Sequence, residues 1–150
     1  MSPFSTVRAA AAFCLLIAAL PHPVAEAETL CLTVDGKERT ATFAVGVGDK
    51  LALGFTHSIY GTQVEELFRI GARGFQPVRL RYAEQRLVEF YGHEAARLED
   101  GWWVVDESGA ELAALDLRTS HDASMRVVFR ARQFSLGGRA RLSVSACSGK

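Results

Sequence analysis

The residues best suited to chemistry are a histidine and a glutamate that stand where apolar side chains are expected. Both lie in residues 51–70, where His57 and Glu66 interrupt two alternating runs of apolar residues. A buried histidine that donates to a carboxylate is tolerated in a core, because the bond satisfies both groups and fixes the tautomer of the ring. Such a pair either stabilises the core or orients a ligand, a metal ion or a reacting group, and both interpretations stay open.

The two runs predict a β-hairpin that brings the pair together. Gly61 and Thr62 fit a two-residue type II′ turn, because glycine suits the first central position, where φ is positive. Counting outward from that turn sets His57 opposite Glu66 and makes every other pair on this face apolar. The apolar pairs are Ile59 with Val64, Phe55 with Phe68, and Leu53 with Ile70.

Ser58 does not form a catalytic dyad with His57. Neighbouring residues of a strand point to opposite faces, so the hydroxyl and the imidazole diverge. The sequence also has no G-x-S-x-G motif, no glycine-rich phosphate loop and no dinucleotide fingerprint. We therefore expect no catalytic residues, although His57 and Glu66 could serve as base and orienter if a substrate proton lay within reach.

A metal site is the alternative that these residue types allow. His57, Glu66 and His93, with Glu94 as a further ligand, supply imidazole and carboxylate groups, which Zn²⁺ and Cu²⁺ both accept. The chain has no H-x-x-x-H or H-x-H spacing, so the pattern does not specify a metal. We expect no cofactor, with zinc or copper as the alternative.

Residues 1–27 have the pattern of a secretory signal peptide. Arg8 precedes an apolar run over residues 9–20, and Ala25, Glu26 and Ala27 form an A-x-A cleavage pattern. The run is too short to span a bilayer, so we expect a mature chain of residues 28–150 without a membrane span, located in the periplasm or secreted.

Export also determines the chemistry that the cysteines are expected to show. Cleavage removes Cys14 and leaves Cys31 and Cys147 near the two ends of the mature chain, in an oxidising compartment. A disulfide between them is therefore predicted, and it would join the first strand to the last.

The elements that must position these residues form a single all-β domain. The chain has 150 residues, a net charge of 0 and 49% hydrophobic residues, which suits one globular domain and gives no indication of nucleic-acid binding. Short alternating runs predict about ten short strands in an antiparallel sandwich or a partly closed barrel. Expected hairpins include one that turns at Asp35 and Gly36 and one that joins residues 102–105 to residues 111–117. Residues 87–91 are interpreted as a short strand followed by a loop.

Four segments resemble a known family. They are THSIYGTQVEE, Phe90-Tyr91-Gly92, LEDGWWVV and LDLR. They resemble an uncharacterised family of bacterial secreted domains, domain of unknown function 1850, often encoded beside TAXI-type TRAP transporter permeases. The family pattern maps onto Thr56, His57, Ser58, Thr62, Val64 and Glu66, and then onto Tyr91, Gly92, Asp100, Gly101, Trp102 and Arg118.

The resemblance implies export and a link to solute uptake, and it supplies no reaction. With the inward pair, it leads us to expect an exported, non-enzymatic binding or accessory protein associated with a TRAP-type solute uptake system. Its partners would be transporter components or a small solute, and His57, Ser58, Glu66 and Arg118 would line the recognition site. The alternative is a periplasmic metal-binding protein that uses the histidine and glutamate cluster.

Overall fold

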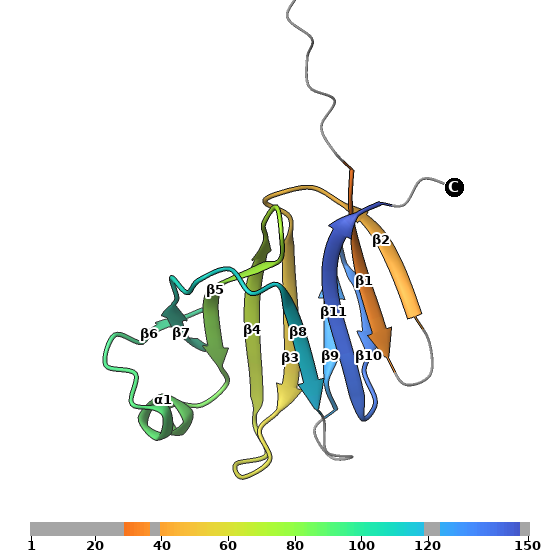
Figure 1. Cartoon of the computed structure of the whole chain (residues 1–150). Coiled ribbons are helices and arrows are strands. Elements are labelled where there is room, and N and C mark those ends of the chain that lie inside the picture. Colours follow the sequence, from red (N-terminus) through yellow and green to blue (C-terminus); the bar gives the residue numbers. More distant parts are fainter. Residues whose placement is uncertain (1–28, 37–39, 119–123, 148–150) are drawn as a thin grey trace, which may run out of the picture.

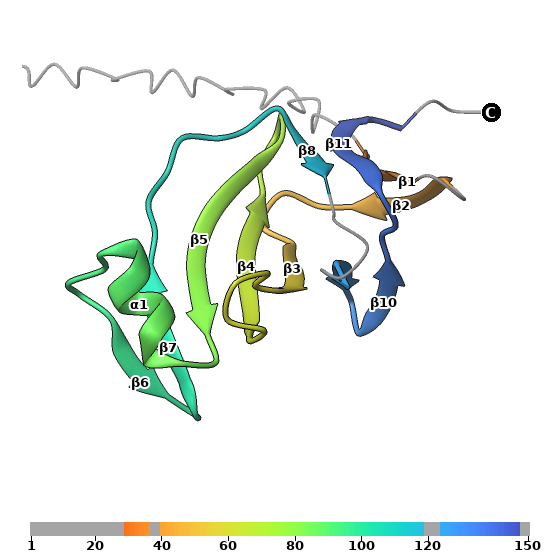
Figure 2. The same ribbon diagram turned by 90° about the horizontal axis from the view of Figure 1, so that it is seen from below.

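Two antiparallel sheets make up the fold in the computed structural model, which describes residues 29–36, 40–118 and 124–147. Figures 1 and 2 show the smaller sheet packed over one end of the larger sheet, near β3, β9 and β10. The predicted all-β sandwich is confirmed, and neither sheet closes into a barrel. No helix within these ranges is long and apolar enough to cross a membrane.

The smaller sheet has the order β2-β1-β11-β8. Its strands are β1 (Leu30–Gly36), β2 (Thr40–Val45), β8 (Ala114–Arg118) and β11 (Arg139–Ala146). The larger sheet has the order β10-β9-β3-β4-β5-β7-β6. Its strands are β3 (Lys50–Thr56), β4 (Gln63–Ile70), β5 (Phe75–Tyr82), β6 (Arg97–Glu99), β7 (Trp102–Asp106), β9 (Arg126–Phe129) and β10 (Arg132–Ser135).

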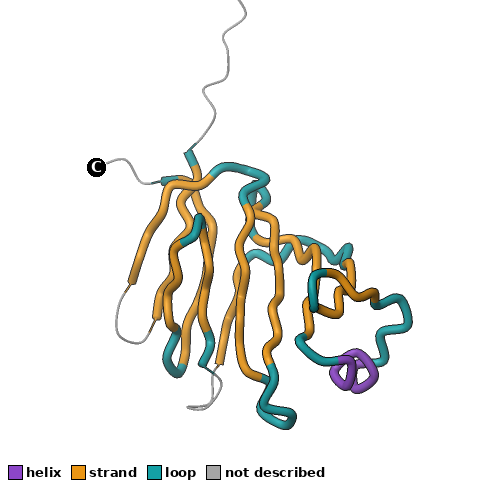
Figure 3. The backbone as a smooth tube through the Cα atoms, turned by 180° about the vertical axis from the view of Figure 1, so that it is seen from behind, coloured by secondary structure: helices purple, strands orange, loops and turns teal. Residues whose placement is uncertain are grey.

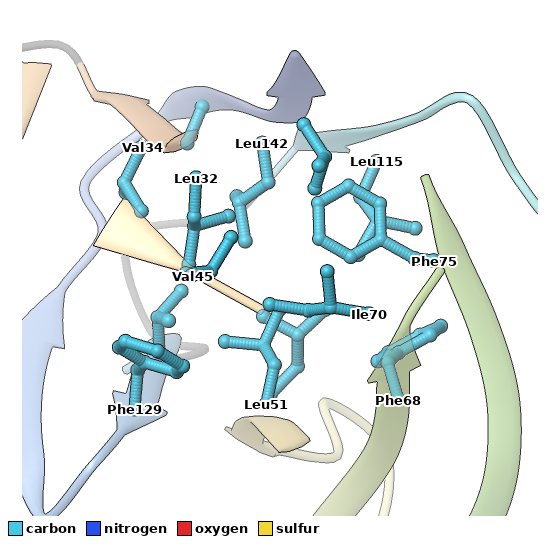
Figure 4. Packing of buried hydrophobic residues seen from close by; sticks show 14 of the residues in the cluster. Leu32, Val34, Val45, Leu51, Phe68, Ile70, Phe75, Leu115, Phe129 and Leu142 are labelled. Atoms are coloured by element: carbon cyan, nitrogen blue, oxygen red, sulfur yellow. The ribbon is translucent and has the colours of Figure 1, made fainter. Parts of the chain in front are cut away.

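A hydrophobic core lies between the two sheets, as Figure 4 shows. Alternate residues of β1, β3, β4, β9 and β11 point into it, which is the period-2 pattern expected for sheets with one buried face. Its largest fully buried side chains are Phe75, Leu32, Leu51, Leu53, Ile70, Leu142 and Val127.

The first and last strands of the described chain are neighbours, and a disulfide joins them. β1 pairs with β11 over its whole length, and Cys31 bonds to Cys147 with 4.9 Å between the Cα atoms. The predicted disulfide is therefore confirmed. The predicted signal peptide, residues 1–27, lies outside the described residues.

The connection after β7 differs from the prediction. β7 pairs with β5 and β6, whereas β8 pairs with β11, so the expected hairpin of residues 102–105 and 111–117 is wrong. Residues 107–113 instead cross to the other sheet, and Leu112 exchanges two backbone hydrogen bonds with Phe75, at 2.7 and 2.8 Å. Gly74 permits this approach, because a Cβ there would overlap the Leu112 carbonyl. The tube in Figure 3 shows this long connection between the sheets.

Residues 87–91 form part of a helix rather than the predicted strand. Helix α1 spans Gln85–Tyr91, buries Leu87 and Val88, and ends at Gly92, whose φ is 70°. The valine and the two aromatic residues favoured a strand. A left-handed glycine is a common helix end, and the amide of His93 bonds back to the carbonyl of Val88.

Helix α1 covers a second hydrophobic cluster on the larger sheet. Val64, Tyr82, Leu87, Val88 and Val105 are its buried members. β4 runs through both clusters, because Val64 belongs to the second cluster and Phe68 to the first. In Figure 2, α1 lies inside the curve formed by β5, β6 and β7.

Candidate functional site

The loop between β3 and β4 is longer than a two-residue turn. The ladder ends at the pair Thr56 and Gln63, and the amide of His57 donates to the carbonyl of Thr62 at 2.8 Å. Gly61 has a φ of 65° and its amide donates to the carbonyl of His57. The predicted turn, and with it the opposition of His57 and Glu66, is therefore wrong. The partner of Glu66 on β3 is Leu53.

His57 is buried at the base of this loop, with 7% of its surface exposed. Its Nδ1 lies 3.4 Å from the amide nitrogen of Tyr60, and its Nε2 lies 3.1 Å from the hydroxyl of Tyr91. Because the amide of Tyr60 can only donate, Nδ1 accepts its hydrogen bond. Nε2 then carries the ring N–H, which donates a hydrogen bond to the hydroxyl of Tyr91. The histidine therefore joins the loop to helix α1.

Three rings surround this histidine and form an aromatic cluster with it. The ring of His57 lies 5.4 Å from Tyr60, 5.5 Å from Phe90 and 5.8 Å from Tyr91, measured between ring centroids. Phe90 and Tyr91 are 49% and 48% exposed, and Ile59 at the loop tip is 68% exposed. Phe90 and Tyr91 therefore present apolar surface to solvent beside the buried histidine. Figures 1 and 3 show the loop and α1 at the same end of the sheet.

Glu66 lies on the other side of Tyr91, in a pocket of about 190 Å³. Its neighbours on β3 and β5 are Leu53 and Leu80, so apolar side chains flank the carboxylate along the sheet. Burial raises the pKa of Glu66, and the charge of Glu107 raises it further. The residues that line the pocket are Phe55, Val64, Glu66, Leu80, Tyr82, Tyr91 and His93.

The adjacent carboxylate of Glu65 shows how unusual this environment is. Glu65 points to the opposite face of β4, where it pairs with Arg81 at 2.9 Å and with Arg126 at 3.6 Å. Among the residues that the structure describes, none hydrogen-bonds to or forms an ion pair with the carboxylate of Glu66. Both carboxylates are therefore partly buried, but Glu65 is paired with arginines and Glu66 has no partner among the described residues.

Two tyrosines form the aromatic wall of the pocket. The rings of Tyr82 and Tyr91 stack with 5.7 Å between centroids, and the hydroxyl of Tyr82 lies 2.9 Å from Nε2 of His93. Burial raises the pKa of Tyr82 and of Tyr91, and the charge of Glu66 raises both further. The pocket therefore disfavours additional negative charge.

The structure brings together some of the predicted ligand-binding residues and separates others. His57 and Glu66 lie on two sides of Tyr91, and Ser58 is exposed in the adjoining loop. Arg118 lies in the smaller sheet opposite Arg139, where it lines a different groove of about 460 Å³ with Asp35 and Asp116. The site in the larger sheet is therefore built without Arg118.

The predicted metal ligands do not converge. His57 bonds to Tyr91 and His93 bonds to Tyr82, so the two imidazoles engage different tyrosines. Within residues 29–36, 40–118 and 124–147, no group of three or more His, Cys, Asp or Glu side chains could hold a metal ion.

Sequence reasoning missed the part that tyrosines play in this site. Tyr60 and Tyr82 were not candidates, and Tyr91 entered only as part of a family motif. A signal was available for Tyr82, because it follows Leu80 on the inward face of β5 and is 2% exposed. The helical position of Tyr91 was hidden by the interpretation of residues 87–91 as a strand.

These features define an antiparallel β-sandwich with an aromatic, acidic pocket beneath a short helix. A family model described as Domain of unknown function (DUF1850) matches residues 51–136, more than half of the chain, so the chain belongs to that family. The comparisons with curated proteins and with solved structures give no match.

Proposed function

We propose that this protein is an exported binding module that acts without chemistry, as an accessory to a TRAP-type solute uptake system. The observation that carries the proposal is the exposed pair of rings of Phe90 and Tyr91, which both contact buried His57, with exposed Ile59 in the adjoining loop. Exposed apolar side chains that cluster together are typical of recognition surfaces. Export and the link to uptake follow from the resemblance to secreted domains encoded beside TRAP permeases.

The polar groups of the site favour binding over reaction. Both ring nitrogens of His57 are engaged by protein groups, and the nearby hydroxyl of Ser58 is on an exposed loop position. A general base needs a free nitrogen or oxygen within reach of the substrate proton. His57 is therefore better suited to positioning Tyr91 than to moving protons.

The test is recovery of transporter components from periplasmic extracts by the purified protein. We expect the native chain to recover a TRAP permease or its solute-binding protein, and Ile59→Ser/Phe90→Ser to lose it. Leu98→Ser is the matched control, because Leu98 is 62% exposed on β6 and is not part of the aromatic cluster. Recovery of no transporter component, together with normal solute uptake in a deletion strain, would rule the proposal out.

A further inference from the structure

The pocket of Glu66 has a chemical character that specifies a class of ligand. It combines one unpaired carboxylate with the rings of Phe55, Tyr82 and Tyr91. Of the described residues that line it, none is an arginine or a lysine. A partly buried carboxylate in a pocket lined by aromatic rings is an arrangement that attracts an organic cation, because the ring faces carry negative charge density.

The charges around the pocket act in the same direction. Glu107 lies near enough to Glu66 for the two carboxylates to repel each other, and the tyrosines experience the same negative field. Among the described lining residues, His93 is the one histidine, and its Nε2 is engaged by the hydroxyl of Tyr82. A cationic ligand would therefore reduce the repulsion between Glu66 and Glu107, which no arginine or lysine among the described lining residues offsets.

The size of the pocket and its lining exclude other ligand classes. A volume of about 190 Å³ is smaller than the ~300–1,000 Å³ of drug-sized pockets, so the ligand has few heavy atoms. A divalent metal needs several oxygen, nitrogen or sulfur ligands, and most of this lining is carbon. An anion would meet the carboxylate of Glu66 without a compensating charge.

We propose that this pocket binds a small organic ammonium ion, with Glu66 neutralising the charge and the rings of Tyr82 and Tyr91 packing on its alkyl groups. This assignment deepens the proposed binding function and rests on it. Tyr91 connects the pocket to the exposed cluster, because its hydroxyl bonds to His57 while its ring lines the pocket. A ligand in the pocket would therefore change the environment of the exposed cluster.

The test is an NMR titration of the purified, disulfide-intact protein at constant ionic strength. Tetramethylammonium and methylammonium are the probes, and tert-butanol is the uncharged control of similar shape. We expect saturable shifts at the rings of Tyr82 and Tyr91 with the ammonium ions and none with tert-butanol. Binding should weaken as the pH is lowered, because protonation removes the charge of Glu66.

Glu66→Gln tests the role of the carboxylate, because it keeps the size of the side chain and removes the charge. We expect this variant to bind the ammonium probes at least about tenfold more weakly. Glu94→Gln makes the same chemical change at an exposed position outside the pocket, and it should bind as the native chain does. The spectrum of each variant without ligand establishes that it is folded.

Three results would overturn the proposal: no saturable shift with either ammonium ion, equal binding of tert-butanol, or undiminished binding by folded Glu66→Gln. Each can occur while the protein still recovers transporter components through Ile59 and Phe90. Conversely, ammonium binding without any transporter partner would leave the pocket assignment standing and overturn the accessory role. The two proposals therefore fail independently.

Discussion

Tyr91→Phe removes a single oxygen atom and should destabilise the whole helical end of the domain. The hydroxyl of Tyr91 accepts a hydrogen bond from Nε2–H of His57, with 3.1 Å between nitrogen and oxygen, and His57 is 7% exposed. Without that oxygen, the imidazole N–H faces the ring edge of a phenylalanine and has no acceptor. The variant therefore leaves a buried donor unsatisfied while the packing of the ring stays the same.

The expected cost follows from the burial of the two partners. Leaving a buried donor without an acceptor costs about 1–3 kcal/mol. The hydroxyl belongs to a residue that is 48% exposed, so water can partly replace it, and the cost should lie near the lower end of that range. A loss of about 1 kcal/mol corresponds to a fall in melting temperature of roughly 2–8 °C for domains of about 60–250 residues.

Urea unfolding of the native chain and of four variants, Tyr91→Phe, Tyr60→Phe, His57→Leu and the double variant of His57 and Tyr91, measures this cost. Tyr60→Phe is the matched control, because the Tyr60 ring packs on His57 while the bond to Nδ1 comes from the backbone amide. In a His57→Leu background, Tyr91→Phe should cost almost nothing, since the donor is gone. Equal unfolding midpoints for Tyr91→Phe and the native chain, or the same cost in both backgrounds, would refute the assigned hydrogen bond.

Three further predictions concern stability. Because burial raises the pKa of Glu66, the contribution of this group to stability is complete below its ordinary value of 4.5 and is lost as the pH rises through the raised pKa. Glu66→Gln should therefore melt above the native chain at pH 7, and the gap should close below pH 4.5; a pH-independent gap would contradict this sign. Replacing Cys31 and Cys147 with alanine should cost up to about 5 kcal/mol in urea unfolding, because the disulfide closes a loop with a sequence separation of 116; unchanged stability would show that the bond does not form. Gly74→Ala should cost at least about 2 kcal/mol, because its Cβ would overlap the carbonyl of Leu112, and hydrogen exchange at the amide of Phe75 should accelerate; native-like exchange would place the crossing segment elsewhere.

Turn residues in the sequence predict hairpins between neighbouring strands, but they do not predict which distant strands pair. β1 and β2 pair as expected for the first hairpin, although Asp35 and Gly36, the predicted turn residues, belong to β1 and Asp35 pairs with Thr40. β8 and β11 instead find partners far away in the chain, and no turn residue specifies such pairing. Only the disulfide between Cys31 and Cys147 gave long-range information, because export made their pairing the simplest expectation.

The helix shows a second limit, which lies in the balance between propensity and packing. Residues 87–91 include a valine, a phenylalanine and a tyrosine, and these types favour strands on local grounds. Leu87 and Val88 become buried against β5 and β7 only when the segment is helical, so tertiary packing decides the outcome. The glycine at position 92 was the one local sign of a helix end, and a helix of seven residues gives too short a pattern to outweigh composition.

In the hairpin of β3 and β4, the sequence predicts the correct face of the sheet for Glu66 but the wrong register along β3. Alternation determines which face a side chain occupies, and a shift of the register by an even number of residues preserves every face. The predicted pairing joined His57 to Glu66, whereas the observed pairing joins Leu53 to Glu66, which is an even shift of four residues along β3. Glu66 therefore points inward as predicted, and His57 is buried as predicted, but the longer loop moves the histidine past the end of the strand. Tyr91 from α1 lines the pocket beside Glu66, so the structure has a pocket with an unpaired carboxylate where the sequence predicted a hydrogen-bonded pair of His57 and Glu66.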